Sequence, residues 1–154
     1  FFKTKNINKY NLNRVSVVLF PESRRKEKEW AHFKKLGEIL KNELNLNVII
    51  SGVKSNENFK EFNDLRGKVP LCDLPQLIKT ASLIVTNDSA PLHIASSQNA
   101  KAIALFGPTN PEKYGPFPKN QKTTTVIQSE TQNINDISVE QVLNEILILI
   151  RKEI

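Results

Sequence analysis

The segment Asn87–His93 (NDSAPLH) holds the side chains of this chain that are best suited to chemistry. It follows an apolar run, and Pro91 is typical of a first helical turn, so the segment is expected to join a strand to a helix. The amides and dipole of a helix start attract anions, and the Ser89 hydroxyl adds a donor, which together suit a phosphate or pyrophosphate. His93, about one turn further on, can face the same anion. Asp88 can accept hydrogen bonds from sugar hydroxyls.

A second candidate segment is the charged loop after the first apolar run of the chain. Its side chains able to contact phosphate are Ser23, Arg24, Arg25, Lys26 and Lys28. Lysine and arginine at these positions can neutralise a diphosphate. Purely structural roles stay open for both segments. The loop can be a solvated basic loop, Asp88 or Ser89 a helix cap, and His93 a packing residue under a sheet.

Several other chemistries are excluded by motifs that the sequence lacks. Neither the G-x-G-x-x-G nor the P-loop pattern is present. Two histidines and one cysteine form no cluster with metal-ligand spacing, so no metal and no cofactor is assigned. Ser89 and His93 lack a nucleophile elbow, which argues against a hydrolase triad. The basic residues are not grouped with aromatic ones, so no nucleic-acid partner is expected.

The elements that must position these segments alternate between strands and helices. Short apolar runs predict strands at 15–20, 48–50, 83–86, 102–106 and 123–127, with a very short strand in 66–69. Apolar residues at helical spacing predict helices from Trp30 to Leu44 and over 55–64, 73–81, 90–98 and 138–150. This alternation indicates an α/β fold with a parallel sheet covered by helices on both sides. Ligands bind such sheets at the carboxyl ends of the strands, where both candidate segments lie.

Composition indicates a globular chain with an anionic partner. The chain has 154 residues, 39% of them hydrophobic, with a formal net charge of +6, which is ordinary for one folded domain and suits phosphates. The single Cys72 leaves no internal disulfide and is typical of a reducing compartment. No apolar run reaches the roughly 20 residues of a membrane span. Because the chain lacks methionine and opens on Phe1, we expect a piece of a longer protein, with a linker over 1–14 and a domain over 15–154.

Residues 83–116 (LIVTNDSAPLHIASSQNAKAIALFGPTNPEKYGP) resemble the signature of glycosyltransferase family 9, the bacterial heptosyltransferases of lipopolysaccharide core assembly. That signature has a strand, an N-D-S-G-P-x-H-type turn, a helix, another strand and F-G-P-T. Upstream, 21–30 is similar to the P-G-x-S…K-x-W loop of the family, and 67–74 to its G-K-x-x-L-x-x-L segment. The resemblance covers roughly residues 15–117. Ala90 and Glu22 each stand where the family has a glycine, and Glu22 is expected to add a negative charge near the donor.

The resemblance implies the GT-B architecture, two Rossmann-like halves with a cleft between them. This chain resembles the C-terminal half, which holds the nucleotide-sugar donor, so the N-terminal acceptor half is expected to lie outside it. The implied contacts are Ser23, Lys28, Ser89, Ala90 and His93 to the donor diphosphate, Asp88 to the donor sugar, and Glu57, Lys68 and Val69 to the nucleoside.

The implied reaction is inverting, metal-independent transfer of heptose from ADP-heptose to the lipopolysaccharide inner core. Lys28 and the helix amides would stabilise the leaving diphosphate. The family's general base lies in the other half, so none is assigned here and the isolated chain is expected to be inactive. The implied partners are the ADP-sugar and a glycolipid acceptor, in the cytoplasm or peripherally at an anionic inner membrane. Two alternatives stay open: another GT-B sugar enzyme (a different donor or a nucleotide-sugar epimerase), and a non-catalytic Rossmann-like binding module.

Overall fold

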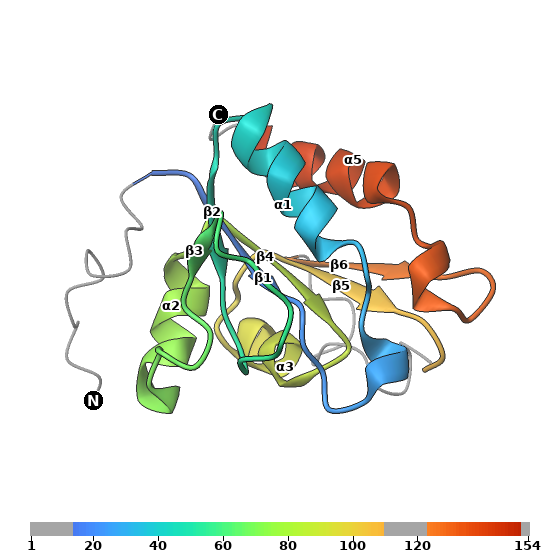
Figure 1. Ribbon diagram of the computed structural model, residues 1–154, viewed down its shortest axis with the longest axis horizontal. Helices are drawn as coiled ribbons and strands as arrows, with labels where there is room; N and C mark the ends of the chain where they lie inside the picture. Colours follow the sequence, from blue (N-terminus) through green and yellow to red (C-terminus); the bar gives the residue numbers. More distant parts are fainter. Residues whose placement is uncertain (1–13, 110–122, 152–154) are drawn as a thin grey trace.

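Six parallel strands form one sheet at the centre of the fold (Figure 1). The computed structural model describes residues 14–109 and 123–151. The strands lie in the order β3-β2-β1-β4-β5-β6. Their bounds are β1 Ser16–Phe20, β2 Asn47–Ile50, β3 Asn63–Asp64, β4 Leu83–Asn87, β5 Ala102–Phe106 and β6 Thr124–Gln128.

The strand order reverses direction between β1 and β4, and this point decides where a ligand can bind. Chain order runs outward from β1 to β2 and β3 on one side, and from β4 to β5 and β6 on the other. The register pairs Val17 with Leu83 and Phe20 with Thr86, so β1 and β4 end at nearly the same level. The loops after these two strands therefore diverge from a common point, which is the preferred ligand position in an open parallel sheet.

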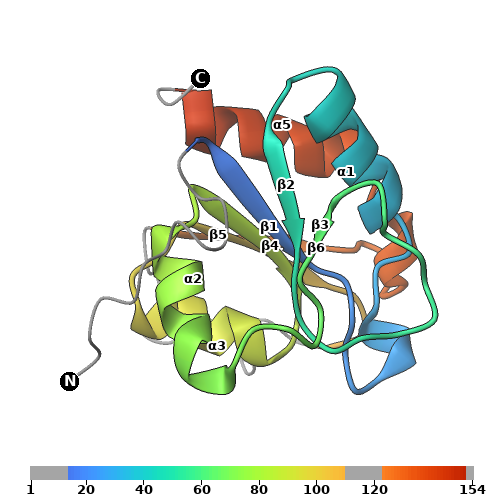
Figure 2. The same cartoon turned by 60° about the vertical axis from the view of Figure 1, so that its left-hand side comes forward.

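Helices cover both faces of the sheet, which confirms the predicted α/β class with three layers. Helices α1 (Phe33–Asn42) and α5 (Val139–Ile150) lie on one face, and α2 (Leu74–Thr80) and α3 (Ala90–Ser97) on the other (Figures 1 and 2). Short 3-10 turns precede α2 and α5 and interrupt the loop after β1, at Leu71–Asp73, Ile134–Asp136 and Lys26–Lys28. None of the helices in the described residues is long and apolar enough to cross a membrane.

The apolar core lies on both faces of the sheet, in two large clusters and a small third one formed by Leu92, Ala104 and Phe106. Val17 and Leu19 of β1 pack with the helices α1 and α5, while Val18 and Phe20 point to the face that α2 and α3 cover. A strand with both faces buried has no reason to alternate apolar with polar residues, and this explains the continuous apolar runs in the sequence. The two layers of core hold the strand ends, and with them the loops at the carboxyl edge, in fixed positions.

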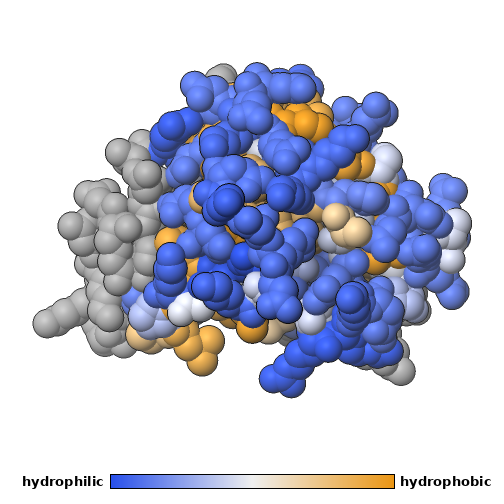
Figure 3. Space-filling model, in the orientation of Figure 1, coloured by the Kyte–Doolittle hydropathy of each residue, from blue (hydrophilic) through white to orange (hydrophobic). Residues whose placement is uncertain are grey.

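The surface over this core is predominantly polar. Hydrophilic side chains dominate the face seen in Figure 3. The large apolar side chains that are exposed in the described part of the chain are Val53, Leu71, Val126 and Ile148, and they come from four different elements or loops.

Two predicted elements are wrong. Residues 55–64 do not form a helix: the chain is irregular as far as Phe62 and then adds the two-residue edge strand β3. Phe59 and Phe62 are both buried, but a single turn, with Phe62 N–H donating to Phe59 C=O at 3.0 Å, brings them to the core. The very short strand expected in 66–69 is a turn, in which Gly67 has a φ of +71°.

The other predicted strands and helices are confirmed, with ends that differ by up to three residues. The helix expected from Trp30 begins at Phe33, and the Trp30 N–H is bonded to the side chain of Asn87 instead. Ser138 caps the last helix as expected, its hydroxyl accepting from Gln141 N–H at 3.1 Å. The predicted linker 1–14, apart from Arg14, and the part of the F-G-P-T loop beyond Thr109 lie outside the described residues.

Candidate functional site

Three loops converge on the carboxylate of Asp88 at the point where the strand order reverses. Lys28, from the loop after β1, donates to Asp88 Oδ2 at 3.1 Å. Thr109, from the loop after β5, donates its hydroxyl to the same oxygen at 2.7 Å. The Lys28 and Asp88 side chains are 17% and 6% exposed, so the ion pair is largely shielded from water. The sequence predicted that Lys28 and Asp88 would share a site, but it did not identify Thr109 as part of it.

Helix α3 begins beside this ion pair, and its N-terminus is not capped by a side chain. Ser89, at the N-cap position, is extended, and its hydroxyl shares a hydrogen bond with the Thr86 hydroxyl at 3.2 Å instead of capping the helix. Ala90 is exposed, and its amide lies in the first turn, where backbone N–H groups have no partner within the helix. The amide and the helix dipole therefore favour an anion at this position.

His93 lies in the first half of α3 and is exposed. The structural explanation in which His93 packs under the sheet is therefore wrong. The idea that Ser89 acts as an ordinary side-chain cap is also wrong, because its hydroxyl bonds elsewhere. The His93 side chain is therefore accessible to a ligand, whereas the Ser89 hydroxyl is bonded within the turn and must turn away from Thr86 to reach one.

Asn87 fastens both ends of the charged loop to the end of β4. Its side chain is fully buried; Oδ1 accepts from Trp30 N–H at 3.1 Å and Nδ2 donates to Pro21 C=O at 3.1 Å. Pro21 and Trp30 bracket the loop that carries Lys28, so one amide fixes that loop against the strand that carries Asp88. Sequence reasoning missed this role. The available signal was a polar residue at the last position of an apolar strand next to the switch point.

Ser23 is held inside the same loop. Its N–H donates to Glu29 Oε1 at 3.1 Å, and its hydroxyl accepts from Arg25 N–H at 3.4 Å. Ser23 is half-buried, whereas Arg24, Arg25 and Lys26 are exposed. The loop thus presents Lys28 to the strand ends and directs its other cations toward solvent.

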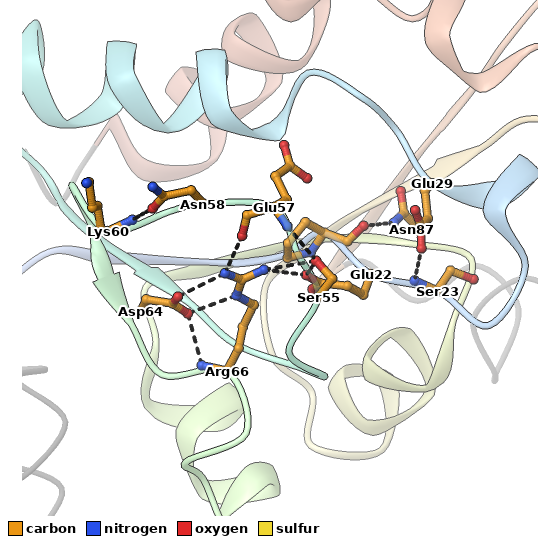
Figure 4. A network of polar contacts seen from close by, with 11 residues as sticks. Glu22, Ser23, Glu29, Ser55, Glu57, Asn58, Lys60, Asp64, Arg66 and Asn87 are labelled. Atoms are coloured by element: carbon orange, nitrogen blue, oxygen red, sulfur yellow. Dashed lines mark hydrogen bonds and ion pairs between the residues drawn. The ribbon is translucent and has the colours of Figure 1, made fainter.

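A buried arginine connects the loops on the other side of β1 (Figure 4). Arg66 is 3% exposed, and its guanidinium forms a two-pronged pair with Asp64, through Nε to Oδ1 and Nη2 to Oδ2, both at 2.9 Å. Nη1 donates to Glu22 Oε1 at 2.7 Å, and Nη2 donates to the Glu57 C=O at 2.7 Å. The hydrogen bonds from Arg66 hold the pKa of Asp64 below its usual range.

This arrangement changes the expectation for Glu22. The sequence indicated an added negative charge near the donor, but the Glu22 carboxylate is paired with the Arg66 guanidinium, 44 residues further along the chain. The charge is therefore neutralised within the protein. Sequence reasoning did not identify Arg66, since the signal for it is a partner that only the fold brings close.

The residues expected at the nucleoside lie around this arginine. The Glu57 carboxyl points away from the guanidinium in Figure 4, while its backbone carbonyl faces it. Partial burial, and then the nearby charge of Glu22, raise the pKa of Glu57. Lys68 is exposed and Val69 half-buried. The Lys68 N–H donates to Leu65 C=O at 3.0 Å, so this amide is used within the turn, and adenine recognition there stays a prediction.

Among residues 14–109 and 123–151, no three histidine, cysteine, aspartate or glutamate side chains are grouped to hold a metal ion. Metal independence stays a prediction. At the switch point of the sheet, the Lys28 ammonium and the start of α3 are suited to an anion.

Comparison with known proteins gives a consistent family. A family model described as glycosyltransferase family 9 (heptosyltransferase) matches residues 2–144. The chain is 32% identical over 110 residues to lipooligosaccharide heptosyltransferase 2 of Haemophilus influenzae, a match over 62% of this chain and 32% of that protein. It is 26% identical over 152 residues to lipopolysaccharide heptosyltransferase 2 of Salmonella typhimurium, over 82% of this chain and 44% of that one.

Solved structures share the fold. ADP-heptose lipopolysaccharide heptosyltransferase II of Escherichia coli superposes with a TM-score of 0.74 at 25% identity, covering 96% of this chain and 50% of that chain. A family 9 glycosyltransferase from Veillonella parvula gives 0.80 at 21% identity, covering 95% and 49%. The E. coli heptosyltransferase WaaC with ADP gives 0.76 at 18%, covering 88% and 44%. The chain thus spans between a third and a half of the length of these proteins.

Proposed function

The chain belongs to glycosyltransferase family 9, and from this membership we propose that it is the donor-binding, C-terminal half of a heptosyltransferase-like inverting glycosyltransferase. The reaction proposed is transfer of heptose from ADP-heptose to the lipopolysaccharide inner core. The observation that carries the proposal is the meeting of Lys28, Asp88 and the start of α3 at the switch point of the sheet. Relatives named as heptosyltransferases, and a solved relative with ADP, support the choice of donor.

The donor diphosphate is placed between Lys28 and the first turn of α3. Lys28 supplies a charge-assisted hydrogen bond, and the Ala90 amide and Ser89 hydroxyl supply neutral donors at the positive end of the helix dipole. His93 lies on the same helix, and the Ser23 hydroxyl lies in the loop that carries Lys28. As the sugar leaves, negative charge grows on the diphosphate. Once the bound diphosphate has engaged these donors, they hold the growing charge in place during the reaction, which lowers the barrier.

Asp88 is assigned to the donor sugar. Its Oδ2 accepts from both Lys28 and Thr109. When a phosphate engages the Lys28 ammonium, the carboxylate keeps the Thr109 hydroxyl and gains an acceptor position for a sugar hydroxyl. Transfer also needs an acceptor hydroxyl and a general base, and we assign neither to this chain. The isolated chain is expected to bind the donor and to leave transfer to the longer protein.

The nucleoside is assigned to the loops after β2 and β3. Glu57 is proposed to bind the ribose, and the backbone of Lys68 and Val69 to contact the adenine. The exposure of the Glu57 carboxyl and its closeness to the loop after β1, seen in the effect of Glu22 on its pKa, support this placement.

The acceptor is proposed to be a glycolipid presented by the other half of the enzyme. We place the reaction in the cytoplasm at the surface of the inner membrane. Arg24, Arg25 and Lys26 support this location, since they are exposed on the loop after β1 and cations are attracted to anionic lipid.

Calorimetric titration of the chain with ADP, UDP and GDP tests the proposal. We expect ADP to bind most tightly, and Lys28→Ala to weaken ADP by about 10- to 100-fold, because a hydrogen bond from a charged group is worth roughly 1.5–3 kcal/mol. Lys35→Ala is the matched control, since Lys35 is an exposed cation on α1. Tighter binding of UDP or GDP would favour another GT-B sugar enzyme. Failure of all three nucleotides, in the chain and in the longer protein, would overturn the proposal.

A further inference from the structure

Arg66 is the side chain that joins the loops on the nucleoside side of the site. Its guanidinium contacts Glu22 from the loop after β1, Glu57 from the loop after β2, and Asp64 at the end of β3. It also lies over the Phe59 ring, 4.8 Å from the ring centroid. Three strand ends are therefore held together by one buried cation (Figure 4).

The loop after β2 depends on this cation for its shape. Residues 53–58 are exposed and contain no helix or strand. The contacts that hold the loop to the rest of the fold include the Arg66 Nη2 bond to the Glu57 carbonyl and the contacts of Ser55 with Glu22 and Arg66. The Glu57 backbone is therefore held by a side chain nine residues further along the chain.

The geometry of a guanidinium is needed for this task. Arg66 uses Nε and Nη2 for Asp64, Nη1 for Glu22, and Nη2 again for the Glu57 carbonyl. These acceptors lie in different directions around one planar group. A lysine ammonium at this position keeps the charge but cannot reach all of them from one point.

We propose that Arg66 is a positioning residue that sets the Glu57 loop for nucleoside binding and neutralises Glu22 beside the donor. This role for Arg66 rests on the proposed function, because it takes Glu57 as the ribose contact. Arg66 acts through Glu57 and does not itself touch the ligand. It follows that Arg66 affects ligands that carry a nucleoside and leaves the diphosphate contacts of Lys28 and α3 unchanged.

Titration of the wild type and Arg66→Lys with ADP and with inorganic pyrophosphate tests this separation. We expect Arg66→Lys to weaken the affinity for ADP about tenfold, which is roughly 1.4 kcal/mol of binding free energy. The affinity for pyrophosphate should stay within about twofold of the wild-type value. A general loss of structure would instead weaken the affinities for both ligands together. Adding Glu57→Gln to Arg66→Lys should cost little further ADP affinity, since the two residues act through one contact.

Ser55→Ala keeps the test decisive if Arg66→Lys does not fold. Ser55 is exposed, donates to Glu22 Oε1 at 2.9 Å and accepts from Arg66 Nη1 at 3.2 Å. Its removal should weaken ADP about two- to threefold, again without changing pyrophosphate. Equal loss of both ligands, or unchanged ADP binding by the folded variants, would overturn the role of Arg66. A wild type that binds pyrophosphate but not ADP would instead contradict the proposed function.

Discussion

Asp88→Asn should tighten the binding of ADP although it removes a residue of the proposed donor site. In the structure the Lys28 ammonium is engaged by the Asp88 carboxylate at 3.1 Å. A diphosphate that approaches Lys28 must compete with that carboxylate and is also repelled by its charge. Asparagine keeps an oxygen that can accept from Lys28 and from Thr109, but it removes the negative charge.

The size of the effect follows from the ion pair. At 3.1 Å and an effective dielectric constant of about 20, the attraction between the two charges is roughly 5 kcal/mol before desolvation is subtracted. Desolvation of a shielded pair cancels much of this attraction, and the asparagine oxygen retains part of the hydrogen bonding. A net gain of about 1–2 kcal/mol remains for ADP, which corresponds to roughly 5- to 30-fold tighter binding.

Calorimetry on the chain measures this gain. Glu38→Gln is the matched control, because it removes one negative charge from the exposed side of α1. Sugar transfer by the longer protein that carries Asp88→Asn should fall, since a neutral amide oxygen accepts a hydrogen bond from the sugar more weakly than a carboxylate does. Unchanged or weaker ADP binding by Asp88→Asn, with the control equal to the wild type, would refute the idea that Asp88 and the diphosphate compete for Lys28.

Three further predictions concern the stability of the fold. Gly107→Ala should destabilise the chain by about 1–3 kcal/mol in urea unfolding, because the new Cβ would lie 2.8 Å from the Ile134 backbone nitrogen. Ser138→Ala should cost about 1 kcal/mol in the same assay, through loss of the α5 cap. The pKa of Glu57 is raised in the folded state, so the wild type should lose stability relative to Glu57→Gln as the pH rises above ~4.3, the ordinary pKa of a glutamate. The difference in melting temperature between the two proteins should therefore grow between pH 4 and pH 7. A difference that stays constant would contradict this prediction.

The core strands and capped helices could be predicted from the sequence because each is specified locally. β1, β4 and β5 are short and predominantly apolar runs rich in β-branched residues, which favour strands buried on both faces. Helix α5 combines a Ser138 cap with apolar residues at helical spacing. The strand-to-helix junction at the candidate anion site could be predicted for the same reason, since a strand, a short turn and a proline in the first helical turn follow one another in the sequence.

The part of the site that could not be predicted depends on long-range partners. Phe59 and Phe62 have the spacing of a helix, yet a single turn buries both, one of them under the Arg66 guanidinium. Glu22 could be recognised as a charge, but its partner lies 44 residues away. Asn87 joins β4 to Pro21 and Trp30, 66 and 57 residues distant. Local propensity contains no information on such pairs, which arise only when the strands assemble.

A titration of the isotope-labelled chain with ADP, followed through its backbone amide resonances, tests the central claim most directly. We expect the largest shifts at Lys28, Ser89 and Ala90, which line the proposed diphosphate position. Amides of α5, on the opposite face of the sheet from α3, should change little, and Lys28→Ala should shift the whole titration to higher ADP concentration. Saturable shifts centred elsewhere, with the start of α3 unchanged, would contradict the donor site proposed for this edge of the sheet.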